Sequence, residues 1–93
     1  MRVIGRRLLV SGRVQGVFYR SWTVATARAL GVTGWVRNLR SGEVEIHAVG
    51  PEAAVAALAE RCRQGPPAAE VEEVEVFQAA AEPFDRFDTR PTA

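Results

Sequence analysis

Short runs in which apolar and polar residues alternate recur along the chain. Each run predicts a β-strand, because successive side chains of a strand point to opposite faces. The pattern places strands at residues 6–11, 33–39, 43–49 and 70–78. A last run, from Phe84 to Arg90, predicts a short edge strand. We therefore expect four main strands and a tail strand.

The same alternation predicts which strand residues are buried. Leu8 and Val10 are expected to share the buried face of the first strand, and Val74 and Val76 that of residues 70–78. His47 alternates with apolar neighbours and falls on the polar face with the strand's glutamates. We expect it to be a solvated side chain and not a catalytic base.

Helical spacing occupies two other stretches. Residues 20–30 carry Trp22, Ala25 and Ala29 at positions i, i+3 and i+7, and Gly31 supplies a stop. A second helix is expected to begin at Gly50-Pro51, because proline is favoured in the first helical turn. Its apolar stripe, at i, i+3, i+4 and i+7, consists of Val55, Leu58, Ala59 and Cys62.

The predicted order is β-α-β-β-α-β followed by the tail strand. This is the split βαβ, or ferredoxin-like, arrangement of the α+β class, with two helices on one face of an antiparallel sheet. A chain of 93 residues is expected to be one domain, residues 1–93, with a single modest core.

Composition narrows the function further. The net charge of +1 is too small to favour nucleic acid or an acidic membrane as a partner. Cys62 is the only cysteine, so no intrachain disulfide can form, and the first residues lack the apolar region of a signal peptide. We therefore expect a cytoplasmic protein, and a monomer. Its His, Cys, Asp and Glu residues lack metal-ligand spacing, which predicts no metal and no cofactor.

The most informative segment lies between the first strand and the first helix. Gly12 and Gly16 let the backbone turn tightly and approach a ligand. A loop that feeds a helix start points several N–H groups, and the positive end of the helix dipole, at one place, which suits a phosphate. Arg20, at the mouth of the loop, carries planar donors that match phosphoryl oxygens. Nucleotide-binding glycine motifs are absent from the sequence.

Two motifs together resemble the signatures of the acylphosphatase family. The first is Gly12-Arg13-Val14-Gln15-Gly16-Val17-Phe18-Tyr19-Arg20, and the second is Gly34-Trp35-Val36-Arg37-Asn38-Leu39, followed by Gly42. Their order and spacing are those of the family, and the likeness extends over about residues 5 to 90. The chain departs from the family pattern at Ser41, Thr89 and Pro91. We expect none of the three to touch the residues that do chemistry.

The resemblance implies hydrolysis of an acyl phosphate, a small-molecule substrate, to a carboxylate and inorganic phosphate. It also implies Arg20 and Asn38 as the catalytic pair. The phosphoryl group would be held by Arg20 and by the backbone N–H groups of the loop, at Gln15, Gly16, Val17, Phe18 and Tyr19. Asn38 would orient the attacking water, since a carboxamide can hold water without adding negative charge. The leaving carboxylate is one candidate acceptor for the water's proton.

Two other readings remain open at this stage. Ferredoxin-like sheets with exposed aromatic side chains can bind single-stranded RNA, although no aromatic ribonucleoprotein motif falls on a predicted strand. A non-catalytic module that binds a small anion is the other. The presence of Asn38 favours the hydrolase, because anion binding alone would not require it. We expect Arg20 and Asn38 to converge, with the strand that carries Asn38 next to the strand that feeds the loop.

Overall fold

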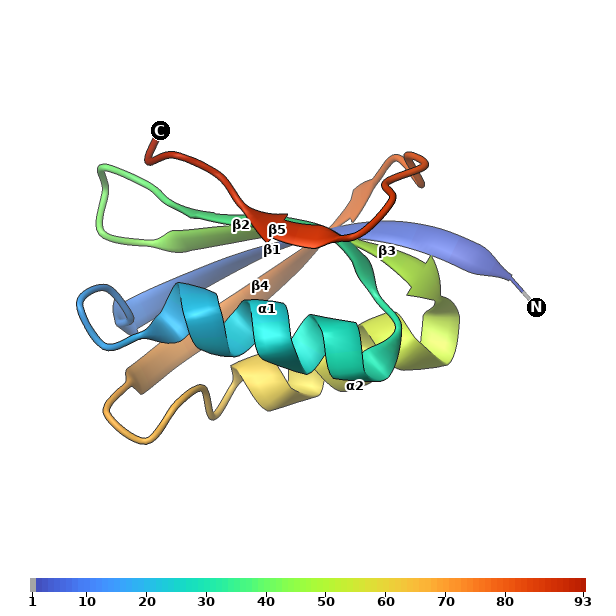
Figure 1. The fold of residues 1–93 in the computed structure, drawn as a ribbon. Coiled ribbons are helices and arrows are strands. Elements are labelled where there is room, and N and C mark those ends of the chain that lie inside the picture. Colours follow the sequence, from blue (N-terminus) through green and yellow to red (C-terminus); the bar gives the residue numbers. More distant parts are fainter. Residues whose placement is uncertain (1) are drawn as a thin grey trace.

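The computed structural model describes residues 2–93. Its elements follow in the order β1 (Val3–Arg13), α1 (Tyr19–Leu30), β2 (Thr33–Asn38), β3 (Val44–Pro51), α2 (Glu52–Cys62), β4 (Glu70–Ala79) and β5 (Phe87–Thr89). Both helices lie on one face of the sheet (Figure 1). Within residues 2–93, no helix is long and apolar enough to cross a membrane.

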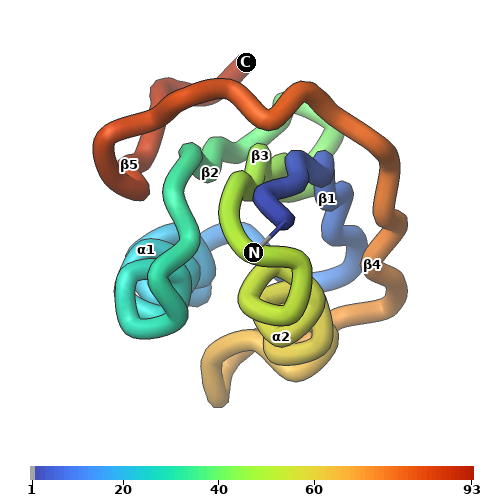
Figure 2. Tube along the Cα trace, turned by 90° about the vertical axis from the view of Figure 1, so that its right-hand side faces the viewer, coloured from blue at the N-terminus to red at the C-terminus, as the bar shows by residue number. Residues whose placement is uncertain are grey.

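The five strands form one sheet in the order β4-β1-β3-β2-β5. The β1–β3, β1–β4 and β2–β3 pairs are antiparallel, which confirms the ferredoxin-like arrangement, whereas β5 pairs with β2 in parallel. The sheet is therefore mixed and not wholly antiparallel as expected. The reason is visible in Figure 2: after β4 the chain crosses the sheet on the side away from the helices and reaches the opposite edge.

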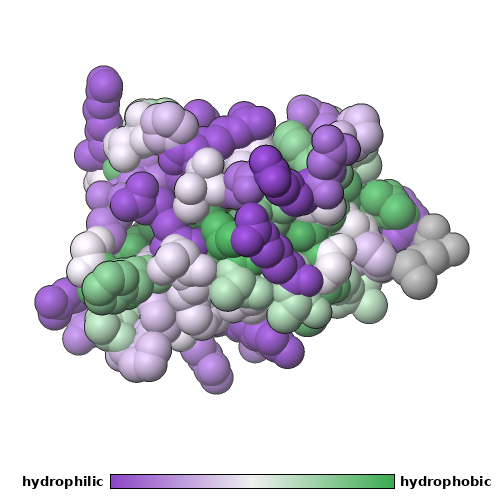
Figure 3. Space-filling model, in the orientation of Figure 1, coloured by the Kyte–Doolittle hydropathy of each residue, from purple (hydrophilic) through white to green (hydrophobic). Residues whose placement is uncertain are grey.

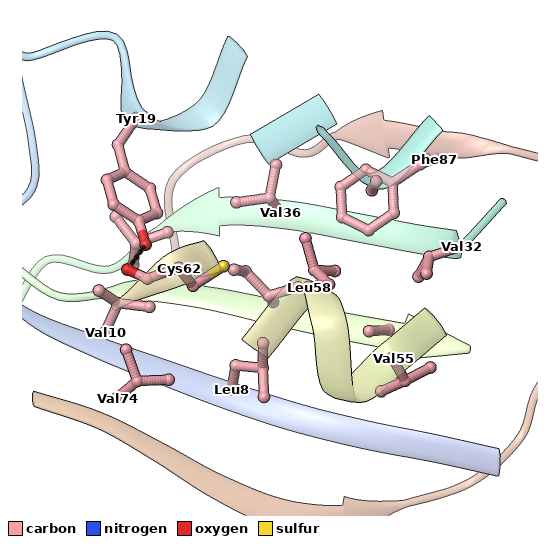
Figure 4. Packing of buried hydrophobic residues seen from close by; sticks show 14 of the residues in the cluster. Leu8, Val10, Tyr19, Val32, Val36, Val55, Leu58, Cys62, Val74 and Phe87 are labelled. Atoms are coloured by element: carbon pink, nitrogen blue, oxygen red, sulfur yellow. Dashed lines mark hydrogen bonds between the residues drawn. The ribbon is translucent and has the colours of Figure 1, made fainter. Parts of the chain in front are cut away.

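The core fills the space between the helices and the sheet (Figure 4). Leu8 and Val10 are fully buried there, as expected, and the stripe of α2 is also confirmed, with Val55, Leu58 and Cys62 buried. Val74 is buried, but the expectation for Val76, on the same edge strand β4, is wrong, since this residue is 46% exposed.

The buried face of α1 differs from the expectation. Tyr19, Thr23 and Ala27 are buried, at spacing i, i+4 and i+8, whereas Ala25 and Ala29 are exposed. Thr23 can be buried because its hydroxyl donates to the carbonyl oxygen of Tyr19 at 2.8 Å. Periodicity of apolar residues missed this face, since the helix buries a threonine and leaves two small alanines outside.

An ion-pair cluster lies on the sheet face opposite the helices. Glu45 is only 6% exposed and accepts hydrogen bonds from Arg7 and from Arg37, the latter at 2.7 Å. The guanidinium of Arg37 also lies 4.7 Å from the ring centre of Trp35. Arg37 is therefore held by structural contacts on the face away from the helices.

His47 is half-buried on the same face and is not a freely solvated side chain. Its Nε2 lies 2.8 Å from the carbonyl oxygen of Ala80, and its ring packs edge-on against Trp35 and Phe84. These partners belong partly to the crossover segment between β4 and β5, which sequence patterns did not place over the sheet. The expectation that His47 is not a catalytic base stays a prediction.

Candidate active site

The loop between β1 and α1 has an unusual backbone. Gly16 has φ 74° and Phe18 has φ 64°, both in the left-handed region, and Phe18 is the N-cap of α1. Left-handed residues in a turn direct neighbouring N–H groups into one concavity, and the helix start adds positive potential there. Glycine adopts this conformation freely, whereas a non-glycine residue incurs about 1–3 kcal/mol of strain. The loop backbone can therefore hold an anion.

Side chains on either side of Phe18 anchor the loop in the core. Val17 and Tyr19 are 4% and 2% exposed, whereas Phe18 itself is 83% exposed. The hydroxyl of Tyr19 donates to the carbonyl oxygen of Cys62, at the end of α2, at 2.6 Å (Figure 4). Burial raises the pKa of Tyr19, so the phenol stays a neutral donor. The start of α1 is thereby fixed against the end of α2.

A second anchor joins the loop to the β2–β3 hairpin. The Nε2 atom of Gln15 donates to the carbonyl oxygen of Leu39 at 2.8 Å and to that of Glu43 at 2.9 Å. Sequence reasoning had assigned only the backbone of Gln15. The one hint in the sequence is chemical: a carboxamide nitrogen carries two donors, which suits a bridge between two carbonyl groups.

Asn38 is the last residue of β2 and lies directly before Leu39. Its Oδ1 is buried and has no hydrogen-bond partner among residues 2–93. Buried polar atoms without a partner are uncommon in folded proteins, and they often mark a place for a water or a ligand. This oxygen is therefore available to accept a hydrogen bond within the site.

The strand that carries Asn38 was expected to lie next to the strand that feeds the loop, and this expectation is wrong. Arg20 and Asn38 nevertheless line one cleft. β3 lies between β1 and β2, so the strand with Asn38 is not next to the strand that feeds the loop. The loop instead reaches the β2–β3 hairpin through the side chain of Gln15. Arg20 and Asn38 consequently line the same cleft despite the intervening strand.

That cleft has a volume of about 470 Å³. Its lining comprises Val14, Gln15, Gly16, Phe18, Tyr19, Arg20, Ser21, Asn38 and Thr89. All of the expected site residues except Val17, whose side chain enters the core, are therefore brought together. The lining holds no Asp, Glu or His, and Arg20 forms no ion pair with any residue from 2 to 93. The electrostatics of the cleft favour an anion.

Three lining residues were not assigned to the site from the sequence: Val14, which belongs to the first motif, Ser21 and Thr89. Thr89, in β5, was expected to lie away from the chemistry, but the parallel pairing of β5 with β2 brings it to the cleft. Ser21 follows Arg20 in the first turn of α1, and its hydroxyl donates to the carbonyl oxygen of Phe18 at 3.2 Å. The place of Thr89 at the cleft follows from the pairing of β5 with β2, and no local sequence pattern specifies which strand β5 pairs with.

Cys62 is fully buried, as expected, and burial raises its pKa to about 12. The thiol is therefore neutral and poorly nucleophilic at physiological pH. In the part of the chain that the structure describes, no group of three or more His, Cys, Asp or Glu side chains is placed to hold a metal ion.

The chain matches a family model. The match is to Acylphosphatase and covers residues 6–89. A protein of Rhodospirillum rubrum named acylphosphatase is 51% identical over 83 residues, which are 89% of this chain and 91% of that protein. Another from Cupriavidus metallidurans, of the same name, is 52% identical over 94% of this chain and 92% of its own length.

Solved structures agree with the sequence relatives. An acylphosphatase from Coxiella burnetii superposes with a TM-score of 0.91 at 38% identity, over 95% of this chain and 93% of that one. An acylphosphatase from Bacillus subtilis superposes with a TM-score of 0.90 at 34% identity, over 96% of this chain and 99% of that one. The similarity extends over nearly the whole length of both chains in each case.

Proposed function

The chain belongs to the acylphosphatase family, and we propose that it hydrolyses acyl phosphates in the cleft between the β1–α1 loop and the end of β2. The reaction cleaves a carboxyl-phosphate anhydride to a carboxylate and inorganic phosphate. The observation that carries the assignment to this cleft is that it combines the cation of Arg20 with the buried acceptor Asn38 Oδ1, both without a partner among residues 2–93.

The β1–α1 loop would bind the phosphoryl group. The left-handed backbone at Gly16 and Phe18 supports this role, because such turns direct N–H groups inward and the start of α1 favours negative charge. The guanidinium of Arg20 would add two parallel donors to the phosphoryl oxygens. Because the loop is anchored by Tyr19 and Gln15 before substrate arrives, little reorganisation is needed in the transition state.

Asn38 would orient the attacking water. Its unpaired Oδ1 can accept a hydrogen bond from that water and so fix its position. An asparagine does this without placing negative charge beside an anionic substrate, whereas an aspartate would repel it. In-line displacement at phosphorus depends chiefly on such positioning and on charge stabilisation.

The proton of the water needs an acceptor that the cleft lining does not supply. Of residues 2–93, no Asp, Glu or His lines the cleft, so we assign this role to the carboxylate that leaves from the substrate. A carboxylate is a good leaving group, and strong general-base catalysis is therefore unnecessary. The protein's share of the chemistry is to hold the phosphoryl group and the water in line.

Two variants test the roles of Arg20 and Asn38. Arg20→Ala should lower kcat/KM by on the order of 10² or more and should raise the inhibition constant of inorganic phosphate. Asn38→Ala should lower kcat severely yet leave the inhibition constant of phosphate nearly unchanged, because the Asn38 carboxamide acts on the water. Arg61→Ala, an exposed arginine on α2, is the matched control and should change neither.

The measurement is phosphate release from acetyl phosphate or benzoyl phosphate, with inhibition by inorganic phosphate. Near-native turnover in Arg20→Ala would refute the assignment of the cleft. If Asn38→Ala weakened phosphate inhibition as much as Arg20→Ala did, Asn38 would be a phosphate ligand and not the residue that holds the water.

We further propose that the protein acts as a cytoplasmic monomer. A lone, buried cysteine thiol suits a reducing compartment, and a net charge of +1 gives no drive toward nucleic acid or membranes. Light scattering at assay concentration tests the monomer, since a dimer would double the mass of 10.1 kDa.

A further inference from the structure

Phe18 occupies its position at a cost to stability. Its backbone is left-handed, which disfavours an aromatic residue, and it stands at an N-cap, where Ser, Thr, Asn, Asp or Gly is preferred. It makes no side-chain capping hydrogen bond, and its ring is 83% exposed. The ring therefore neither caps the helix nor enters the core. A residue that breaks several local rules at once is expected to serve function.

Phe18 is part of the cleft that we assign to the substrate. Phe18 lines the same cleft as Arg20 and Asn38, and it comes from the loop, whereas Asn38 ends the strand on the other wall. Figure 3 shows apolar surface beside polar surface at the end of the molecule where Figure 1 places the loop. The phosphoryl-binding N–H groups and an exposed aromatic ring therefore belong to one short segment.

We propose that Phe18 forms the binding surface for the acyl group and selects flat, apolar acyl groups, aromatic ones above all. The inference rests on the proposed function, because it assigns the second half of the same substrate. With the phosphoryl group held by the loop and Arg20, the acyl group extends toward the open rim of the cleft. A small acyl group such as acetyl leaves the ring of Phe18 uncovered, whereas a benzoyl group can stack on it.

The charges of the cleft agree with an apolar occupant. Among the described residues, Arg20 is the only charged one in the lining, and it is assigned to the phosphoryl group. No second cation in the lining would bind an acyl group that carried its own carboxylate. The exposed face of Phe18 is therefore matched to an uncharged group.

The test compares two substrates across three variants. The quantity is the ratio of kcat/KM for benzoyl phosphate to kcat/KM for acetyl phosphate, in which effects on the shared phosphoryl chemistry cancel. Phe18→Asn removes the ring but keeps a residue that tolerates left-handed φ. Phe18→Tyr keeps the ring. Phe77→Leu alters the other exposed phenylalanine, on β4 and outside the cleft, and is the control.

We expect the ratio to fall about five- to tenfold in Phe18→Asn, as the loss of one aromatic contact implies. It should stay within about twofold of the wild type in Phe18→Tyr and Phe77→Leu. An unchanged ratio in Phe18→Asn would overturn the proposal. If both kcat/KM values fell equally, the loss would be an effect on the loop backbone; if both stayed native, the ring would serve no part of the substrate.

A binding measurement on the wild type covers the case in which Phe18→Asn fails to fold. Calorimetry with phenylphosphonate and methylphosphonate should show about fivefold tighter binding of the phenyl compound. Equal affinities would overturn the proposal. Since this assay needs no turnover, tighter binding of phenylphosphonate without phosphate release from any acyl phosphate would contradict the proposed function but not the preference for an aromatic group.

Discussion

Loss of the Gln15 side chain should lower catalysis through geometry and not through substrate contact. Gln15→Ala removes the two hydrogen bonds that tie the phosphate-binding loop to Leu39 and Glu43. Neither carbonyl group is orphaned, because Leu39 O also accepts from Gly42 N at 3.0 Å and Glu43 O from Leu39 N at 2.8 Å. The cost is therefore near the lower end of the range for a hydrogen bond, about 0.5–1 kcal/mol each and about 1–2 kcal/mol in all.

This energy should appear mainly as misplacement of Asn38 relative to Arg20. Both carbonyl groups belong to the hairpin that follows Asn38, so the link fixes the distance between the bound phosphoryl group and the water. If most of the loss falls on the transition state, kcat decreases about tenfold, which corresponds to about 1.4 kcal/mol. The inhibition constant of inorganic phosphate should change by less than about threefold, since Arg20 and the loop N–H groups remain.

The assay is steady-state kinetics with an acyl phosphate, run beside thermal unfolding so that only folded protein is compared. Gln78→Ala, which alters an exposed glutamine on β4, is the matched control. Gln15→Glu should be worse than Gln15→Ala, because its carboxylate would face two carbonyl oxygens. The reasoning would be refuted if fully folded Gln15→Ala kept its wild-type kcat.

Three further predictions concern buried groups. Tyr19→Phe should cost about 1–3 kcal/mol in the free energy of unfolding, because the Cys62 carbonyl loses its 2.6 Å donor; denaturant titration measures this. Burial alone would raise the pKa of Glu45, but hydrogen bonds from Arg7 and Arg37 outweigh it and hold the pKa below 4.5. Its ion pairs therefore stabilise the fold above that pH and are lost as the pH falls through the lowered pKa. Glu45→Gln should have a lower free energy of unfolding at neutral pH, and this free energy should decrease less on acidification than in the wild type. Activity should survive exhaustive chelation, because residues 2–93 hold no cluster of three or more metal ligands; loss restored by a divalent ion would reveal a missed metal. It should also survive a thiol-blocking reagent, because Cys62 is fully buried.

Sequence patterns identified the elements well because each strand and helix carries its own period. They misjudged the buried face of α1, where Thr23 satisfies its hydroxyl within the helix and so enters the core. They also placed β2 beside β1. Nothing in a strand's own residues specifies its neighbour, which depends on how the whole sheet is assembled. Thr89 was missed for the same reason, since its place at the cleft follows from the pairing of β5 with β2.

The candidate site shows the same division between local chemistry and long-range assembly. Arg20 and the glycine turn can be recognised locally, because a phosphate needs a cation and convergent N–H groups at a helix start. What makes the loop a rigid receptor is not local. Gln15 bonds to carbonyl groups 24 and 28 residues away, and Tyr19 to one 43 residues away. These contacts hold the loop from two sides, against the β2–β3 hairpin and against α2. An enzyme whose substrate already carries a good leaving group gains most from such prior positioning. The residues that were hardest to foresee are thus the ones that we expect to distinguish a catalyst from a loop that only binds phosphate.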